Sequence, residues 1–469
     1  MASTLLPAWL LQRRYTYIVI HESDAQQSGN FIVSPNGPLH GAIDAGGAKN
    51  SVLKLMAACL LAEGTNVLQN VPYIQDVAIM SELLEAIGAK VYRRGHNNAA
   101  PGTGEGTASA DDDLIIETPT TILPEAPYEL VEKIRASIVV LGPLAGRMGR
   151  VKLPLPGGDD FGERPVDMHI DSLSLMGAQF KSTRGCIEAT VPEGRLTGTR
   201  IVLEYPSHTA TDNILMAAVL ANGTTVIENA AREPEVVDLA AMLSSMGARI
   251  KGAGTSRVTV EGVPTLHPAM HRAIADRVVA ATFAAAVGIA GGDVTIRDAR
   301  MDHMDMIVRK MTQMGLRISH SLPQSHPGIR IYRDGGIRLH SVDVSTLPYP
   351  GVATDYAPFI VAMLSIADGV GIVSENLFSG RFRYVDELIR LGANISTEGH
   401  HAVIRGADRL QGALIKAPDI RGGAALVLAG LVAEGETVVT NTMHIDRGYE
   451  DFAGKLASLG ANIQRTSTE

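Results

Sequence analysis

The chain has 469 residues, of which 45% are hydrophobic, 19% charged and only 4% aromatic, and its formal net charge is −9. A chain of this length exceeds what one hydrophobic core usually holds, so we expect two domains. The negative charge argues against a general nucleic-acid or membrane surface, although a few local arginines can still dominate a cleft.

The N-terminal residues 1–29 are predicted to be an extension rather than a signal peptide. An apolar stretch at residues 5–11 precedes Arg13 and Arg14, the reverse of the order that a secretory signal requires. No apolar run is long enough for membrane insertion. We therefore expect a cytoplasmic protein. Cys59 and Cys186 have no disulfide or metal-ligand spacing, and we expect both to be buried thiols.

A sequence motif that is typical of a helix end recurs six times along the chain, and successive copies lie 68 to 89 residues apart. In each copy a Gly caps the helix, and a branched or aromatic residue soon after it begins a strand. The longest interval contains an insertion at about residues 95–113, rich in Gly, Ala, Asn and Asp, which we expect to be disordered. The six capping positions are Gly88, Gly177, Gly247, Gly315, Gly392 and Gly460.

A second kind of helix alternates with the first, and it is apolar nearly all round, as in residues 278–290. Such helices should be buried inside a ring of sheets. Each repeat then holds two helices and several strands in βαβ-like order. Six α/β repeats divide naturally into two domains of three.

The start of each apolar helix carries a polar or charged residue. Basic residues stand at four of the six starts, although cations there oppose the helix dipole. Residues 209–211 and Asp355 stand at the other two. We interpret the set as a shared site for an anion, and the alternative is local pairing, as in Asp276–Arg277 or Asp419–Arg421. The four basic residues are Lys49, Arg135, Arg277 and Arg421.

The loop at residues 152–169 has the composition of a mobile lid. Prolines exclude helix, two glycines allow a tight turn, and Asp159 and Asp160 stand at its tip before Arg164. A proton donor on a lid is one interpretation, and a solvated surface turn is the other. Further arginines precede the outer helices and imply a site between domains for a substrate with several negative charges. These are Arg232, Arg381, Arg383 and Arg447.

In combination these motifs resemble the UDP-N-acetylglucosamine 1-carboxyvinyltransferase family from about Gly37 to the C-terminus. The likeness rests on G-A-K-N at 47–50, R-A-S at 135–137, L-P-x-P-G-G at 153–158, R-P-V-D at 164–167, E-N-A-A-R-E-P-E at 228–235, T-D at 354–355, G-R-F at 380–382 and H-I-D-R-G-Y-E at 444–450. It implies two inside-out α/β barrel domains, each of three repeats. By analogy one lobe combines residues 30–47 with 234–469, and the other spans 48–233 and carries the lid.

The resemblance also implies a reaction. The enolpyruvyl group of phosphoenolpyruvate would pass to the 3-hydroxyl of UDP-N-acetylglucosamine with release of phosphate, the first committed step of peptidoglycan synthesis, without metal or organic cofactor. By position, Asp159 looks like the proton donor, and Asn50 and Asp355 would hold the sugar, Asp355 also moving a proton. The residues implied to contact phosphoenolpyruvate are Lys49, Arg135, Arg164 and Arg447, with Arg381 and Arg421 completing the cationic surface. The nucleotide pocket would be lined by Pro165, Val166, Asp167, Ser207, Thr209 and Leu377.

The sequence departs from the family pattern in two places. The lid position that is often Cys is Asp159, and Asp160 beside it leaves the acid ambiguous. In the nucleotide segment, S-H-T-A-T replaces a glycine-containing pattern and Tyr205 replaces a common lysine. Alternatives are therefore a paralogue acting on another nucleotide in secondary metabolism, or a non-catalytic UDP-sugar-binding regulator. The related 3-phosphoshikimate enzyme is disfavoured because its motifs are missing, and the sequence leaves the oligomeric state open.

Overall fold

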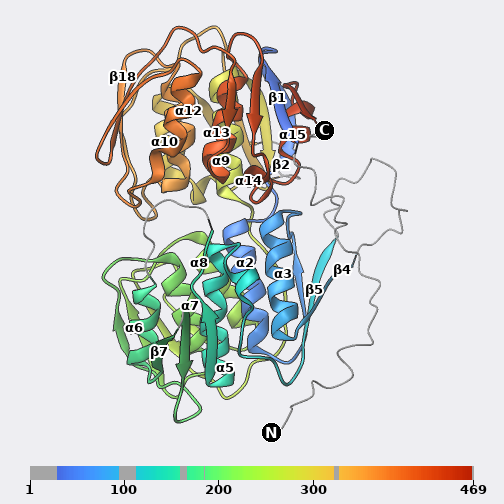
Figure 1. Ribbon diagram of the computed structural model, residues 1–469, viewed down its shortest axis with the longest axis vertical. Helices are drawn as coiled ribbons and strands as arrows, with labels where there is room; N and C mark the ends of the chain where they lie inside the picture. Colours follow the sequence, from blue (N-terminus) through green and yellow to red (C-terminus); the bar gives the residue numbers. More distant parts are fainter. Residues whose placement is uncertain (1–28, 95–111, 159–165, 184, 322–326, 467–469) are drawn as a thin grey trace.

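The computed structural model describes residues 29–94, 112–158, 166–183, 185–321 and 327–466. The N-terminal extension up to residue 28, residues 95–111 of the insertion and the lid tip with Asp159, Asp160, Arg164 and Pro165 lie outside the described residues. Two lobes are stacked along the long axis, each around its own hydrophobic core (Figure 1). No helix in the described ranges combines the length and apolar character needed to span a bilayer.

The chain changes from one core to the other between Ala45 and Val52, and changes back between Ala273 and Val278. Residues 234–273 therefore pack with residues 48–233, whereas the sequence analysis placed them in the other lobe. The reason is that the strands at residues 249–251 and 257–261 complete a sheet that residues 200–228 begin, and the strand at residues 270–272 pairs with the strand at residues 64–69. Below, the first lobe is residues 29–47 with 274–466, and the second lobe is residues 48–273.

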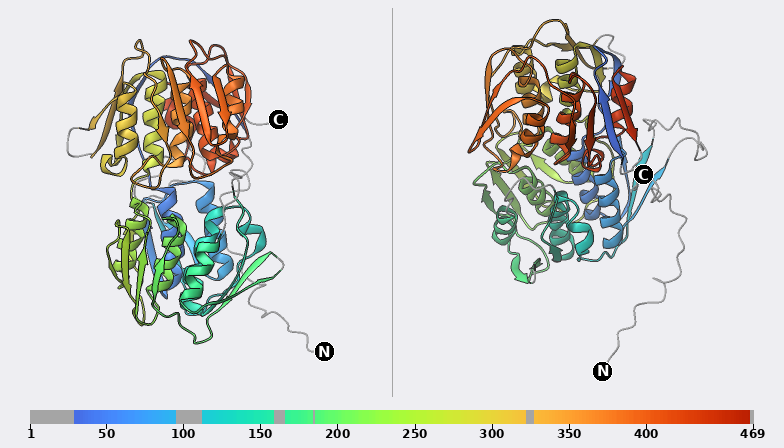
Figure 2. Two further views of the ribbon diagram at one scale, coloured as in Figure 1. Left: turned by 90° about the vertical axis from the view of Figure 1, so that its left-hand side faces the viewer. Right: turned by 45° about the horizontal axis from the view of Figure 1, so that its top comes forward.

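The first lobe has three four-stranded sheets around three buried helices, as the repeat predicted. Its N-terminal strand at residues 30–34 lies between two strands from the C-terminal part of the chain, and the right-hand view of Figure 2 shows it beside them. In order across each sheet, the strands are β21 (Leu414–Lys416), β22 (Thr437–Thr440), β1 (Asn30–Ser34) and β23 (Asn462–Thr466); β15 (Arg317–His320), β16 (Gly328–Arg333), β14 (Gly292–Arg297) and β2 (Leu39–Asp44); and β17 (Val344–Ser345), β18 (Val370–Ser374), β20 (His401–Arg405) and β19 (Asn394–Glu398).

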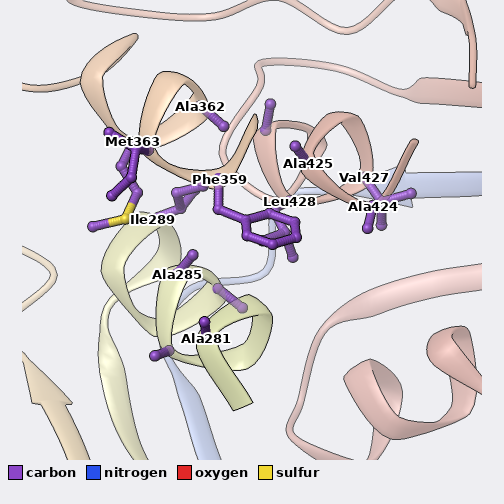
Figure 3. Close-up of a cluster of buried hydrophobic side chains, with 14 of the residues drawn as sticks. Ala281, Ala285, Ile289, Phe359, Ala362, Met363, Ala424, Ala425, Val427 and Leu428 are labelled. Carbon is purple, nitrogen blue, oxygen red and sulfur yellow. The ribbon is translucent and has the colours of Figure 1, made fainter. Parts of the chain in front are cut away.

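The buried helices of the first lobe are α9 (Arg277–Ala290), α11 (Ala357–Leu364) and α13 (Ile420–Gly430). They pack on one another through small residues such as Ala281, Ala285 and Ala425 beside Phe359 (Figure 3). Small side chains let the helix backbones approach closely, so the apolar character of α9 on all sides is satisfied by helices and sheets around it. The remaining helices are α10 (Asp305–Gln313), α12 (Val385–Arg390), α14 (Met443–Asp446) and α15 (Phe452–Ser458), with 3-10 turns η4 (Met301–His303), η5 (Thr354–Tyr356) and η6 (Arg381–Tyr384).

The second lobe repeats this plan, except that one of its sheets has three described strands. Its sheets are β13 (Met270–Arg272), β3 (Gly64–Gln69), β5 (Asp113–Thr118) and β4 (Lys90–Arg94); β6 (Arg150–Pro154), β8 (Cys186–Thr190) and β7 (Gln179–Thr183); and β11 (Arg249–Lys251), β12 (Arg257–Glu261), β10 (Thr224–Glu228) and β9 (Arg200–Val202). Its helices are α2 (Lys49–Ala58), α3 (Gln75–Ile87), α4 (Tyr128–Val131), α5 (Leu141–Met148), α6 (Asp167–Leu175), α7 (His208–Ala218) and α8 (Pro234–Ser245), with η2 (Cys59–Leu61) and η3 (Arg135–Val140). Of these, α2, α5 and α7 are the buried ones.

Local sequence signals explain much of this architecture. The six capping glycines all have a positive φ, between 90° and 114°, which confirms their predicted role. Cys59 is buried as expected, but Cys186 is only partly buried in β8, contrary to the prediction. The predicted fold class, two inside-out α/β barrels of three repeats each, is confirmed.

The two crossover segments lie side by side and bring both lobes to one place. Asp276 N donates to Gly46 O at 2.9 Å, and Ala48 N donates to Ile274 O at 2.8 Å. Gly47 also lets the first crossover lie against the loop after β3, because a Cβ there would stand 1.7 Å from Asn70 O. Lys49 at the start of α2 therefore lies beside Asp276 at the start of α9.

Candidate active site

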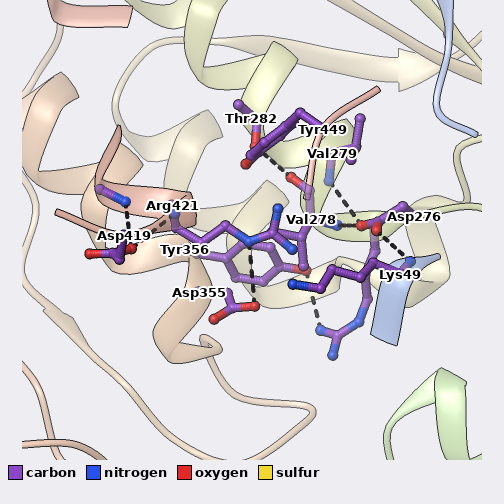
Figure 4. A network of polar contacts seen from close by, with 12 residues as sticks. Lys49, Asp276, Val278, Val279, Thr282, Asp355, Tyr356, Asp419, Arg421 and Tyr449 are labelled. Atoms are coloured by element: carbon purple, nitrogen blue, oxygen red, sulfur yellow. Dashed lines mark hydrogen bonds and ion pairs between the residues drawn. The ribbon is translucent and has the colours of Figure 1, made fainter. Parts of the chain in front are cut away.

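The helices α2, α9, α11 and α13 begin close to one another, and Figure 4 shows Lys49, Asp276, Asp355, Arg421 and Tyr449 gathered there. The residues predicted to stand at the starts of the buried helices lie there, or in the 3-10 turn just before the helix. The charged side chains are held by a small number of buried carboxylates, and these define the geometry of the site.

Asp76, near the start of α3, joins cations from both lobes. Its carboxylate accepts from Lys49 Nζ at 2.7 Å and from Arg447 Nε at 2.8 Å. The side chains of Lys49, Asp76 and Arg447 are 10%, 3% and 12% exposed. Burial lowers the pKa of Lys49, and Arg447 and Arg421 act in the same direction, while Asp76 opposes them. Burial alone would raise the pKa of Asp76, but Lys49 and Arg447 reverse this and hold it below its ordinary value.

Asp355, in η5, lies between two arginines of the first lobe. Its Oδ1 accepts from Arg381 Nη2 at 3.0 Å, and its Oδ2 lies 3.6 Å from Arg421 Nε. Burial would raise its pKa, but Arg421, Arg381 and Lys49 outweigh burial and lower it. The carboxylate is therefore ionised near neutral pH.

The aspartates that precede the arginines cap helices instead of pairing with them. Asp276 accepts from the N–H groups of Val278 at 2.7 Å, Val279 at 3.0 Å and Lys49 at 3.0 Å. Asp419 caps α13 in the same way, accepting from Arg421 N and Gly422 N.

Arg277 also pairs across the lobes and not locally. Its Nε donates to Glu235 Oε1 on α8 at 2.9 Å, and its Nη1 donates to Tyr356 Oη at 3.2 Å. The alternative of local Asp–Arg pairs is therefore wrong, because a capping aspartate uses its oxygens on backbone N–H groups.

A second group of expected residues surrounds His169 in the second lobe. Thr209 Oγ1 lies 3.4 Å from His169 Nε2, and Ser207 caps α7 by accepting from Ala210 N at 3.3 Å. Burial and then the neighbouring Arg135 together lower the pKa of His169 to about 4, against the opposing effect of Asp167. Arg135 begins η3, and its Nη1 donates to Pro156 O at the foot of the lid at 3.1 Å.

The other expected residues that the structure describes lie outside these two groups of contacts. Val166 is the N-cap of α6 and Asp167 its first residue, and Asp167 is exposed. Asn50 lies beside Lys49 on α2, and Leu377 follows β18 in the first lobe, where its N–H donates to Glu375 Oε1 at 2.8 Å.

Several residues of the site were missed in the sequence. Asp76 looked like an acid in the first turn of a helix, a common and unremarkable pattern. Glu235 stands in a motif that was noted only for resemblance, and Lys54 lies inside an apolar helix. Lys54 could have been found from the sequence, because a lysine in a helix that is expected to be buried on all sides needs a partner. Within the described residues, no group of three or more His, Cys, Asp or Glu is placed to hold a metal ion.

The chain is similar in sequence to a known family of enzymes. The sequence profile of the EPSP synthase (3-phosphoshikimate 1-carboxyvinyltransferase) family matches residues 33–456. A UDP-N-acetylglucosamine 1-carboxyvinyltransferase from Nocardia farcinica (strain IFM 10152) is 48% identical over 93% of this chain and 99% of its own length. One of the same name from Mycobacterium bovis (strain ATCC BAA-935 / AF2122/97) is 46% identical over 93% and 98%.

Solved structures show the same fold at low identity. The enolpyruvyl transferase NikO from Streptomyces tendae superposes with a TM-score of 0.81 at 23% identity, covering 94% of this chain and 99% of its own. An EPSP synthase from Acinetobacter baumannii superposes with a TM-score of 0.69 at 19% identity, covering 93% and 100%. At these identities the likeness shows the fold alone.

Proposed function

The chain belongs to the EPSP synthase family and is 43–48% identical to relatives named UDP-N-acetylglucosamine 1-carboxyvinyltransferase, and on this premise we propose that it is a transferase of that kind. Its substrates would be phosphoenolpyruvate and UDP-N-acetylglucosamine, and its products enolpyruvyl-UDP-N-acetylglucosamine and phosphate. The observation that carries the proposal is the meeting of Lys49 and Arg447, from opposite lobes, on the single buried carboxylate of Asp76.

This arrangement suits a substrate with several negative charges. Lys49, Arg447, Arg381 and Arg421 supply positive charge where phosphoenolpyruvate would place its phosphate and carboxylate. Because the lobes contribute jointly, the substrate itself would hold them together and exclude water. The cations are mostly buried, so their charge is screened less by solvent than charge on an open surface.

The proton transfers follow from the charge states. Ionised Asp355 would accept the proton of the sugar 3-hydroxyl as its oxygen bonds to C2 of phosphoenolpyruvate. The C3 methylene would gain a proton from the lid acid, for which Asp159 is our assignment and Asp160 the alternative. The tetrahedral adduct then loses a proton from its new methyl group and expels phosphate, which restores the double bond.

The remaining expected residues would bind both substrates, Arg135 and Arg164 contacting phosphoenolpyruvate and the others the sugar nucleotide. Ser207, Thr209 and Arg135 lie in the second lobe near the foot of the lid, and Asn50 and Leu377 complete the surface. Pro165, Val166, Asp167 and Arg164 follow the lid tip in the sequence. A cytoplasmic location stays a prediction.

A paralogue with another nucleotide acceptor is the second candidate. The observation that favours it is the S-H-T-A-T segment, which departs from the family pattern and whose His208 lies at the start of α7. A non-catalytic regulator is disfavoured, because Lys49, Asp355 and Arg447 are all present in one charged site.

The test is a phosphate-release assay with phosphoenolpyruvate and a series of UDP-sugars. We expect release only with UDP-N-acetylglucosamine present, and loss of release in Lys49→Gln. Lys90→Gln is the matched control, because Lys90 pairs with Glu117 on an exposed surface. Turnover with a different nucleotide, and none with UDP-N-acetylglucosamine, would establish the paralogue instead.

A further inference from the structure

A buried lysine connects the two helix starts that the proposed site uses. Lys54 lies one turn after Asn50 on α2, and its side chain is 4% exposed. Its Nζ donates to Asn50 O, and lies 3.1 Å from His208 Nε2 at the start of α7. It also lies 3.5 Å from Asp212 Oδ2. The mechanism above gives none of these three side chains a role.

The contacts determine where the proton of His208 resides. An ammonium group donates and cannot accept, so a ring nitrogen 3.1 Å away has to accept from it. A neutral imidazole that accepts at Nε2 carries its proton at Nδ1. In the opposite tautomer Nε2 would carry the proton, and its N–H would face the donor N–H groups of Lys54. The nearby acceptor for Nε2 would be Asp212 Oδ2, and the 3.5 Å between these two atoms is long for a hydrogen bond.

The surroundings favour the neutral form of the histidine. Asp212 is fully buried, and among the residues that the structure describes neither of its oxygens has a hydrogen-bond partner, so the nearby Lys54 Nζ is its principal compensation. The pKa of His208 is well below its ordinary value, first because of burial and then because of Lys54. Arg277 lowers it further, while Glu235 and Asp355 oppose the shift.

His208 also faces the space between the lobes. Its side chain is 21% exposed, and charged groups of the first lobe, Arg277 and Asp355, act on its pKa. It stands between Ser207 and Thr209, the expected nucleotide contacts. Within the described part of the chain, Nδ1 makes no hydrogen bond, so it is the polar atom of the ring that remains available to a ligand.

We propose that His208 determines nucleotide specificity by donating its Nδ1–H to an acceptor oxygen of the sugar nucleotide, and that Lys54 is the positioning residue that holds this tautomer. The proposal rests on the proposed function, because it assigns the donor for that reaction's acceptor substrate. A neutral donor contributes a directional contact without adding another charge to an already cationic site.

The first experiment measures the tautomer without any substrate. Nitrogen-15 NMR of the full chain labelled at histidine, with His208 assigned by its loss in His208→Leu, should show a neutral ring protonated at Nδ1 at pH 7. In the Lys54→Met/Asp212→Asn double variant, which leaves no unpaired buried charge, the Nδ1 preference should be lost. A wild-type ring protonated at Nε2, or an unchanged tautomer in the double variant, would overturn the role of Lys54.

The second experiment measures binding of UDP-N-acetylglucosamine by calorimetry, together with KM and kcat. His208→Leu should weaken binding and raise KM for the nucleotide about 5–20-fold, as expected for one lost hydrogen bond, with kcat changed less than about twofold. His208→Asn should restore most of the affinity, since its amide N–H can stand where Nδ1–H stood. His267→Leu, on an exposed histidine, is the control.

The outcomes separate this proposal from the proposed function. Suppose that the wild-type protein turns over and that His208→Leu, His208→Asn and the wild-type protein bind UDP-N-acetylglucosamine equally well. This result would overturn the role of His208 as a donor and leave the proposed reaction intact. If the wild-type protein binds the nucleotide but does not turn it over, the reaction is refuted, and the ratio of Leu to Asn affinities still decides whether His208 donates.

Discussion

Replacing Asp76 by Asn removes one negative charge from between two cations and keeps a side chain of nearly the same size. Lys49 Nζ and Arg447 Nε lie 2.7 Å and 2.8 Å from the carboxylate, and all three side chains are nearly buried. Removing one partner of a buried ion pair usually costs about 3–5 kcal/mol, because the remaining charge is left uncompensated. We expect the free protein to lose about 3 kcal/mol, equivalent to a Tm lower by about 5–10 °C.

The same substitution should change the pH dependence of activity. Asp76 raises the pKa of Lys49 against burial and the nearby arginines, so its removal lowers that pKa further. Activity that needs the Lys49 ammonium is present below this pKa and lost above it. The alkaline limb of kcat/KM for phosphoenolpyruvate should therefore move to lower pH in the variant. Inorganic phosphate should restore Tm more in the variant than in the unsubstituted protein, because the anion replaces the missing charge.

Calorimetry with and without phosphate and a pH series of phosphate release are the assays. The matched control is Asp293→Asn, because Asp293 pairs with Arg330 at an exposed edge where an ion pair contributes about 0–1 kcal/mol. An Asp76→Asn protein with unchanged Tm and an unmoved alkaline limb would refute the role of this carboxylate as the shared partner of both lobes.

Three further predictions concern proton transfer and stability. Asp355→Asn should lower kcat about 10²–10⁴-fold in the phosphate-release assay, as for loss of a general base, and a smaller loss would argue against that role. Asp159→Asn should abolish turnover. Asp159→Cys should keep some activity and become sensitive to fosfomycin, the epoxide antibiotic that reacts with Cys at this lid position in the family that the sequence resembles; full activity of the Asn variant would move the acid to Asp160. His169 should make the protein less stable as pH falls from about 6.5 to 4, because the unfolded chain then binds a proton that the folded chain, with its pKa of about 4, does not. The loss is about 3 kcal/mol, and thermal unfolding across this range should show a smaller fall in His169→Gln.

Local sequence determined the repeat and hence the fold class. A capping Gly such as Gly247 needs a positive φ that other residues adopt at a cost, so its recurrence marks each helix end without reference to the rest of the chain. The apolar helix at residues 277–290 likewise requires burial on every side, and it lies at the centre of the first lobe. Both signals depend on neighbours within a few positions, which is why the sequence reveals them.

Tertiary structure alone decided which charges meet. Asp76 is 371 residues from Arg447 in the chain, and Glu235 is 42 residues from Arg277, so no local pattern could pair them. The lobe membership of residues 234–273 also depended on strand pairing between distant segments. Helix starts could be recognised from sequence because capping and periodicity are local, whereas the partners of Lys49, Arg277 and Lys54 follow from how the two lobes and their crossovers pack together.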